Sequence, residues 1–195
     1  MRKQFALGAI LTLGAMGTAM AAEGLSYNVI EAGYASSDLD LGGGFKLDGD
    51  GFTLAGSAEF SQNLFGFANY GDTDLDGVGL SLFSLGAGFH WPLSPALDLT
   101  SGVSYERVKV EGAGSDGGYG LAVGLRGRAG DALEFNGGVK YADFGGGDGD
   151  DLVFSAGFRY YFTPAFAAGI DFSKWDDLDL STLGVSFRYD FGSRQ

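Results

Sequence analysis

The stretch Thr182–Phe191 reads Thr-Leu-Gly-Val-Ser-Phe-Arg-Tyr-Asp-Phe, and its bulky apolar residues occupy every second position. A period of two indicates a β-strand with one apolar and one polar face. Arg188 and Asp190 lie on the polar face, and the apolar face ends in three alternating aromatics. Such a strand suits a barrel whose outside contacts lipid and whose inside is polar. The apolar row is Leu183, Val185, Phe187, Tyr189 and Phe191.

The same alternation recurs along the rest of the chain. It predicts an all-β fold, an antiparallel up-and-down transmembrane β-barrel of about ten strands, with eight as the alternative. In the run 64–71 the faces stay unassigned, because Phe65 and Phe67 compete with Leu64 and Tyr70 for the lipid. The other expected strands are 26–35, 51–60, 79–91, 97–110, 117–129, 133–144, 152–162, 165–174 and 182–191.

The connections between these strands are of two kinds that alternate. Short turns are expected at 61–63, 92–96, 130–132 and 163–164. Longer acidic loops are expected at 36–50, 72–78, 111–116, 145–151 and 175–179. Outer-membrane barrels have short periplasmic turns and longer extracellular loops, so we expect both termini in the periplasm of a Gram-negative bacterium.

Aromatic residues gather toward both strand ends, as the girdles at two membrane interfaces do. Toward the turns lie Phe60, Trp91, Phe135, Phe162, Phe166 and Phe191, and toward the loops lie Tyr34, Phe52, Tyr105, Tyr119, Tyr141, Phe172 and Trp175. The soluble alternative is a lipocalin-like barrel or β-sandwich with its apolar face inside. The repeated aromatics at strand ends and the small residues on the polar face argue against it.

Composition narrows the function. Apolar residues make up 45% of the chain, which excludes general disorder, and no cysteine is present for disulfide or thiol chemistry. The 36 glycines follow no collagen period and indicate a crowded, curved sheet. The net charge of −13 argues against nucleic-acid binding.

The amino end has the pattern of a cleaved secretory signal peptide. Arg2 and Lys3 form its positive part, Phe5–Met16 its apolar part and Ala19-Met20-Ala21 its cleavage site. The apolar run is shorter than the roughly 20 residues of a membrane anchor. We therefore expect a signal peptide over 1–21 and one barrel domain over 22–195.

The start of the expected mature chain, Glu23–Tyr34, resembles a family of small outer-membrane β-barrel proteins, members of which were once labelled a sulfation-dependent quorum factor. Asp74-Leu75-Asp76 and Val103-Ser104-Tyr105-Glu106 are similar too. The resemblance implies an outer-membrane barrel surrounded by lipid and lipopolysaccharide. The last strand also resembles the signal that the barrel-assembly machinery reads, with Thr182, Gly184, Phe187 and Tyr189 at its polar, glycine and aromatic places, although Gly192–Gln195 follow the final aromatic.

Charges of both signs are expected to point inward. One interpretation is a lumen filled by salt bridges in a structural barrel that displays acidic loops for surface interactions. The alternative is a narrow passive pore in which Arg126, Arg128, Arg159 and Arg188 select anions. The expected inward charges are Glu31, Glu59, Asp98, Glu106, Arg126, Arg128, Glu134, Lys140, Arg159, Asp171, Arg188 and Asp190.

Little else points to chemistry. Asp72–Gly77 matches half a calcium loop, but its twelfth position is Phe83, and Gly146–Val153 fits one copy of a calcium-binding repeat that works by stacking. Weak divalent bridging between these loops and lipopolysaccharide phosphates remains a hypothesis. His90 is the one histidine and has no nucleophile motif beside it, so we expect no enzyme, no cofactor and no metal site.

Overall fold

A computed structural model describes residues 25–145 and 149–192, and over these residues ten strands form one closed antiparallel barrel. The expected signal peptide and residues 146–148 of the expected calcium repeat lie outside the described residues. No helix within the described part is long and apolar enough to cross a membrane. The strands are β1 (Val29–Asp40), β2 (Lys46–Ser61), β3 (Leu64–Leu75), β4 (Val78–Ser94), β5 (Leu97–Val110), β6 (Gly114–Ala129), β7 (Leu133–Asp143), β8 (Asp150–Tyr161), β9 (Phe166–Trp175) and β10 (Leu180–Asp190).

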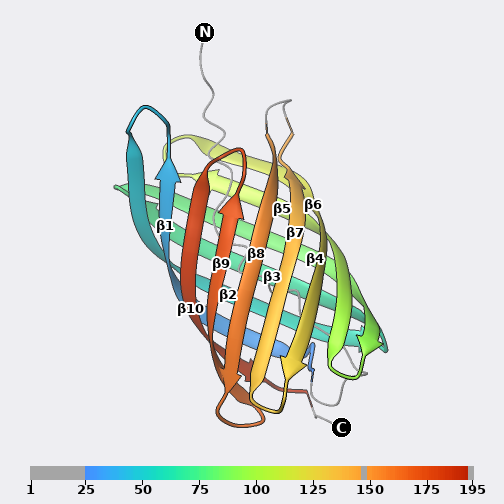
Figure 1. Cartoon of the computed structure of the whole chain (residues 1–195). Coiled ribbons are helices and arrows are strands. Elements are labelled where there is room, and N and C mark those ends of the chain that lie inside the picture. Colours follow the sequence, from blue (N-terminus) through green and yellow to red (C-terminus); the bar gives the residue numbers. More distant parts are fainter. Residues whose placement is uncertain (1–24, 146–148, 193–195) are drawn as a thin grey trace.

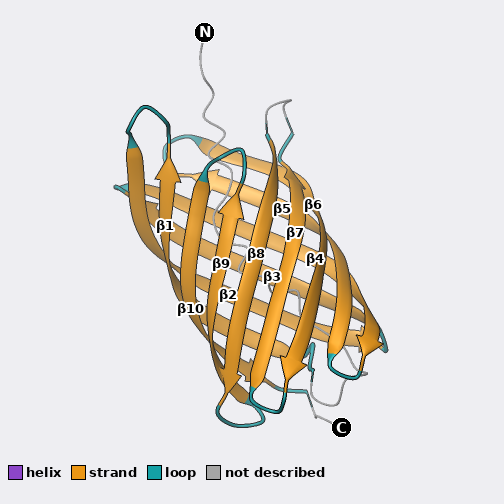
Figure 2. Ribbon diagram, in the orientation of Figure 1, coloured by secondary structure: helices purple, strands orange, loops and turns teal. Residues whose placement is uncertain are grey.

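Each strand pairs with its neighbours in sequence, and β1 pairs with β10 to close the ring (Figures 1 and 2). The closing register runs from Val29 opposite Asp190 to Leu39 opposite Leu180. At the end of β4 the register with β5 shifts between Pro92 and Ser94. Proline cannot donate to a ladder, and it is tolerated at such an irregularity.

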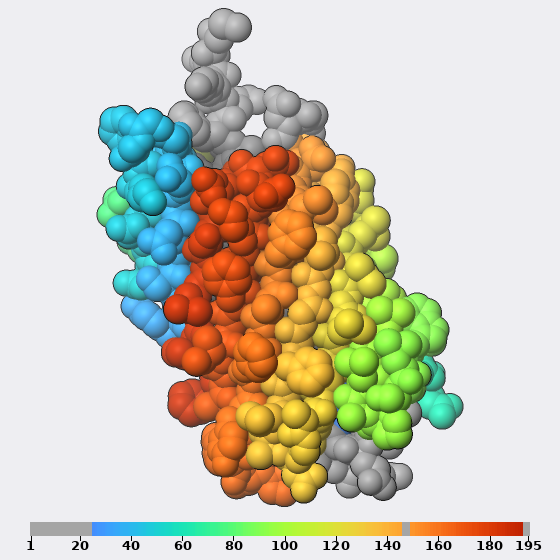
Figure 3. Space-filling view, in the orientation of Figure 1, coloured from blue at the N-terminus to red at the C-terminus, as the bar shows by residue number. Residues whose placement is uncertain are grey.

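The outer wall is apolar, as predicted. Phe158 and Phe187 are each 68% exposed. In Figure 3 the side chains of β7 to β10 cover one side of the barrel as a continuous wall. The six aromatics expected toward the turns are all exposed, as are Tyr34, Phe52, Tyr105, Tyr119 and Phe172 toward the loops. An apolar belt between two aromatic girdles is the surface of a transmembrane barrel.

One girdle assignment is wrong. Trp175 is 1% exposed and lies inside the barrel. The prediction ended the ninth strand at Lys174, whereas β9 includes Trp175. Side chains alternate along a strand, so Trp175 shares the inward face of Asp171 and Ser173.

Three of the five expected acidic loops are too long, because the strands continue into 36–50, 72–78 and 111–116, whereas the connections 144–149 and 176–179 lie close to the expected 145–151 and 175–179. The region 36–50 is expected to be a loop, but β1 and β2 leave only 41–45 unpaired, and β3 and β4 leave only Asp76-Gly77. These two residues have φ of 49° and 86°, as a tight two-residue hairpin turn requires. The connections have two to four residues at the turn end and two to six at the loop end, where the hairpins also continue as paired strands.

In β3, whose faces stayed unassigned, Phe65 and Phe67 point inward. Room for them comes from glycines on β4. A Cβ atom at Gly88 would lie 2.2 Å from the Phe65 ring, and one at Gly86 would lie 2.5 Å from the Phe67 ring. Alternation within β3 alone does not reveal this, because the deciding residues belong to the neighbouring strand.

Candidate functional site

The turn end of the lumen is filled by the chain segment that precedes β1. The first strand is expected from Ser26 but begins at Val29, and Leu25, Ser26 and Tyr27 lie buried inside the ring. Tyr27 stacks on Phe65 and His90 with ring centroids 4.5 and 4.6 Å apart. Its hydroxyl donates to Asp98 at 3.4 Å. These contacts make residues 25–28 a plug at the turn end.

Beside this plug lies a network of buried ion pairs centred on two glutamates. Glu134 accepts two 2.6 Å hydrogen bonds from Arg126 and one of 2.9 Å from Arg188. Arg188 also donates to Glu31 at 2.7 Å, and Arg159 donates to Glu31 at 3.0 and 3.1 Å. Residues of β1, β6, β7, β8 and β10 are thereby joined across the lumen.

Further groups surround the network. Asp171 accepts from Arg159 and from Ser186 at 3.0 and 3.2 Å. The Tyr161 hydroxyl lies 3.2 Å from Glu134 and 3.1 Å from Asp190, and the Arg128 guanidinium lies 4.4 Å from the Tyr161 ring centroid. Charges of both signs therefore meet inside the barrel with partners at hydrogen-bond distance.

Closer to the loop end is a second ion pair. Lys140 donates to Glu106 at 3.2 Å, and Glu106 also accepts from Ser84 and Ser104 at 2.5 and 2.6 Å. The Lys140 ammonium lies 5.4 Å from the Trp175 ring centroid. This cation–π contact joins the ion pairs of the lumen to the Trp175 side chain, which lies nearer the loop end.

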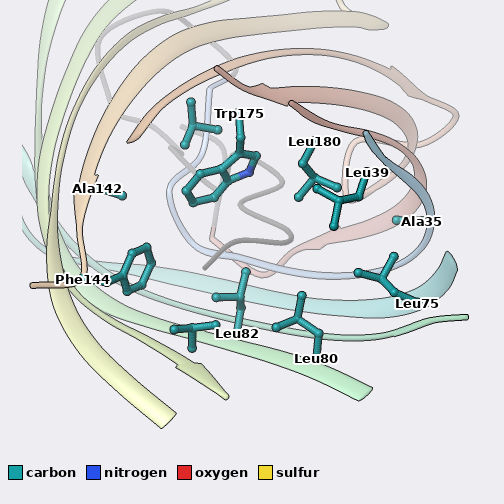
Figure 4. Close-up of a cluster of buried hydrophobic side chains, with 11 residues drawn as sticks. Ala35, Leu39, Leu75, Leu80, Leu82, Ala142, Phe144, Trp175 and Leu180 are labelled. Atoms are coloured by element: carbon teal, nitrogen blue, oxygen red, sulfur yellow. The ribbon is translucent and has the colours of Figure 1, made fainter. Parts of the chain in front are cut away.

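The loop end of the lumen is apolar, which the sequence reasoning missed. Figure 4 shows Trp175 inside the barrel wall, with Leu39, Leu80 and Leu180 pointing into the same space. The signal for this layer is the alternation of leucine with aspartate, as in Asp74-Leu75-Asp76. The apolar layer consists of Ala35, Leu39, Leu75, Leu80, Leu82, Val108, Ala142, Phe144, Val153, Trp175 and Leu180.

Above the loop-side girdle, the polar and apolar faces of the sheet are thus reversed. Within the apolar belt, apolar side chains point out and charges point in. Beyond it, Asp38, Asp48 and Asp74 are exposed outside while Leu39 and Leu75 are buried inside. Water in place of lipid outside accounts for the exchange, because carboxylates then favour the outer face and leucines the core. We call these acidic strand ends the acidic rim.

The structure places every expected inward charge on the inner face, and all of them except Glu59 are buried. His90 is buried, with its Nε2 3.7 Å from a Glu59 carboxylate oxygen. Of the expected assembly-signal residues on β10, Thr182 and Gly184 face inward, whereas Phe187 and Tyr189 face outward.

Acidic residues at the rim do not converge. Asp72 and Asp74 of the expected calcium loop lie on β3, and the described residues contain no group of three or more His, Cys, Asp or Glu that could hold a metal ion. At the β9–β10 connection, a hydrogen bond from Lys174 lowers the pKa of the Asp179 carboxyl. Asp151 accepts from the backbone amides of Asp176 and Asp177, both at 3.0 Å, and so orders that connection.

No family model and no curated protein matches the chain, so the family resemblance described above stays a prediction. Among solved structures, the barrel is similar to a KdgM porin in complex with disordered oligogalacturonate (9% identity, TM-score 0.48, covering 84% of this chain and 99% of that one). It is also similar to Neisserial surface protein A (12%, TM-score 0.47, 85% and 98%). A third is Ail, the attachment invasion locus protein of Yersinia pestis (16%, TM-score 0.41, 84% and 99%). At these scores and identities the likeness extends to barrel architecture and carries nothing about activity.

Proposed function

We propose that the chain is a non-conducting outer-membrane barrel with a structural or surface-interaction role. Its loop end would project outside the cell and display the acidic rim. The apolar belt between two girdles supports the membrane location, because such a surface needs lipid around it. Barrels of this kind occur in the outer membranes of Gram-negative bacteria, which supports that compartment.

The observation that carries the proposal is the apolar layer across the loop end of the lumen. Trp175 and Leu180 are 1% and 2% exposed, so their side chains are almost completely out of contact with water. An ion crossing this layer would lose its hydration without gaining polar ligands, which is costly. The plug at the turn end adds a second obstruction.

The projecting end offers surfaces to a partner. The tip of the β1–β2 hairpin carries Leu41 and Phe45, and Phe45 is 74% exposed. These two side chains offer a partner an apolar contact on an otherwise acidic hairpin. This favours recognition at the cell surface as the role of the projecting end.

A narrow pore is the alternative, and its anion selectivity would come from the lumen arginines. Arg126, Arg159 and Arg188 each hold a carboxylate at 3.0 Å or less, which reduces the positive field available to a passing anion. The buried ion pairs therefore favour a structural lumen.

Recording from planar bilayers tests the proposal. Refolded protein that has inserted, as judged by protection of its strands from protease, should give no channel steps. Stable steps with anion selectivity, lost in an Arg159→Gln variant, would establish the pore instead.

A further inference from the structure

On β5 the rim carries two basic residues next to each other on the outer face. On β5, Arg107 and Lys109 are exposed on the outer face, directly beyond the girdle residue Tyr105. Two residues along a strand span about 7 Å, so the Arg107 backbone is one such step beyond the girdle. The corresponding steps beyond Phe52 and Tyr70 are Asp50 and Asp72, and the step beyond Phe172 is Lys174, which pairs with Asp179.

These two cations have no carboxylate of their own. Neither forms an ion pair within 4.0 Å among the described residues, and Arg107 donates only to the Ser115 hydroxyl, at 3.2 Å. Every other lysine or arginine in the described part of the chain lies inside the barrel or pairs with an aspartate at the rim. The two outside pairs are Lys46 with Asp40 and Lys174 with Asp179.

Three of the four residues opposite these cations on the neighbouring strands are small. Arg107 lies opposite Phe83 on β4 and Gly117 on β6, and Lys109 lies opposite Ser81 and Ser115. A Cβ atom at Gly117 would lie 2.8 Å from the Tyr105 hydroxyl, so the tyrosine covers that glycine. Small polar residues thus flank Lys109, whereas Phe83 and Gly117 flank Arg107, and aromatic and apolar side chains lie below both cations.

We propose that Arg107 and Lys109 bind a phosphate group of lipid A in the leaflet around the loop end. A guanidinium and an ammonium on one face can both donate hydrogen bonds to the oxygens of one phosphate group. The arginine can do so through two parallel hydrogen bonds. The exposed Val103 and Leu121 below them belong to the lipid-facing belt and suit acyl chains. A free phosphate would make no use of that belt. The inference rests on the membrane location proposed above.

Protein refolded in neutral detergent and titrated with diphosphoryl lipid A, with retained lipid counted by native mass spectrometry, tests the site. The variant Arg107→Gln/Lys109→Gln should bind about thirtyfold more weakly, since each basic residue near a lipid surface contributes roughly a factor of five. Lys174→Gln is the matched control, because it removes a cation of the same rim that already has a carboxylate. It should bind like the wild type.

Dephosphorylated lipid A should bind the wild type and the double variant equally, and millimolar inorganic phosphate should not displace diphosphoryl lipid A. Equal binding of diphosphoryl lipid A by wild type and double variant would overturn the proposal. So would an equal loss in Lys174→Gln, or displacement by inorganic phosphate. Failure of the protein to insert into any bilayer would instead refute the membrane location itself.

Discussion

Replacing Glu134 by glutamine tests whether the lumen is the dry, ion-paired interior described above. Both oxygens of Glu134 are occupied, by Arg126 at 2.6 Å, by Arg188 at 2.9 Å and by the Tyr161 hydroxyl at 3.2 Å. Glutamine keeps the shape but removes the charge, and it turns an NH₂ group toward a guanidinium. Breaking a buried ion pair costs about 3–5 kcal/mol. Because Arg188 keeps Glu31, we expect a loss of about 3 kcal/mol, at the low end of that range.

The measurement is urea unfolding of protein refolded into lipid vesicles. With a slope of about 2 kcal/mol per molar urea, the midpoint should fall by about 1.5 M. Glu111→Gln, an exposed change at the rim, is the control and should stay within about 0.5 kcal/mol of the wild type. A loss below about 1 kcal/mol in Glu134→Gln would mean that water solvates the freed guanidinium groups. The lumen would then be wet, and the reasoning against a pore would fail with it.

Three further outcomes are expected. Gly88→Ala should lower the free energy of unfolding by about 1–3 kcal/mol, because the new methyl group would overpack against the Phe65 ring. In a double-mutant cycle of unfolding, adding Phe65→Ala should remove that penalty. Additive losses in the two variants would contradict the contact. Tyr27→Ala should speed hydrogen exchange of the backbone amides in 25–28, since the plug loses its two ring contacts; unchanged exchange would show that the plug is held by other means. In intact cells, a membrane-impermeant thiol reagent should label Gly43→Cys but not Asp131→Cys. The reverse labelling pattern would show that the turn end, not the loop end, faces the outside of the cell.

Much of the barrel could be predicted from the chain because lipid imposes a simple rule on each strand. In the run 97–110 the alternation gives both the faces and the bounds of β5. Prediction fails where that rule stops applying. Beyond the girdle, leucine and aspartate still alternate, but water lies outside the barrel there, so the leucines point inward and the aspartates outward. Judged by composition alone, an acidic stretch such as 36–50 is therefore predicted to be a loop.

The lumen charges could be predicted individually, but their partners could not. Pairing of Glu31 with Arg159 joins residues 128 positions apart, through a ring closure that local pattern does not encode. The plug at the turn end was missed for a related reason. The expected first strand begins at Ser26, so Tyr27 is assigned to the barrel wall, and only the space between the inward rings of β3 and β4 reveals its position inside the barrel.

The plug also has a consequence for the order in which the molecule is completed. Arg126 on β6 donates to the Ser26 carbonyl at 3.3 Å, and Tyr27 reaches Asp98 on β5. In a flat, unclosed sheet these partners would lie several strands apart, so the contacts exist only after the sheet has curved into a ring. The earliest described residues of the chain are therefore among the last to reach their final positions. Burial of the Tyr27 side chain reports that the barrel has closed.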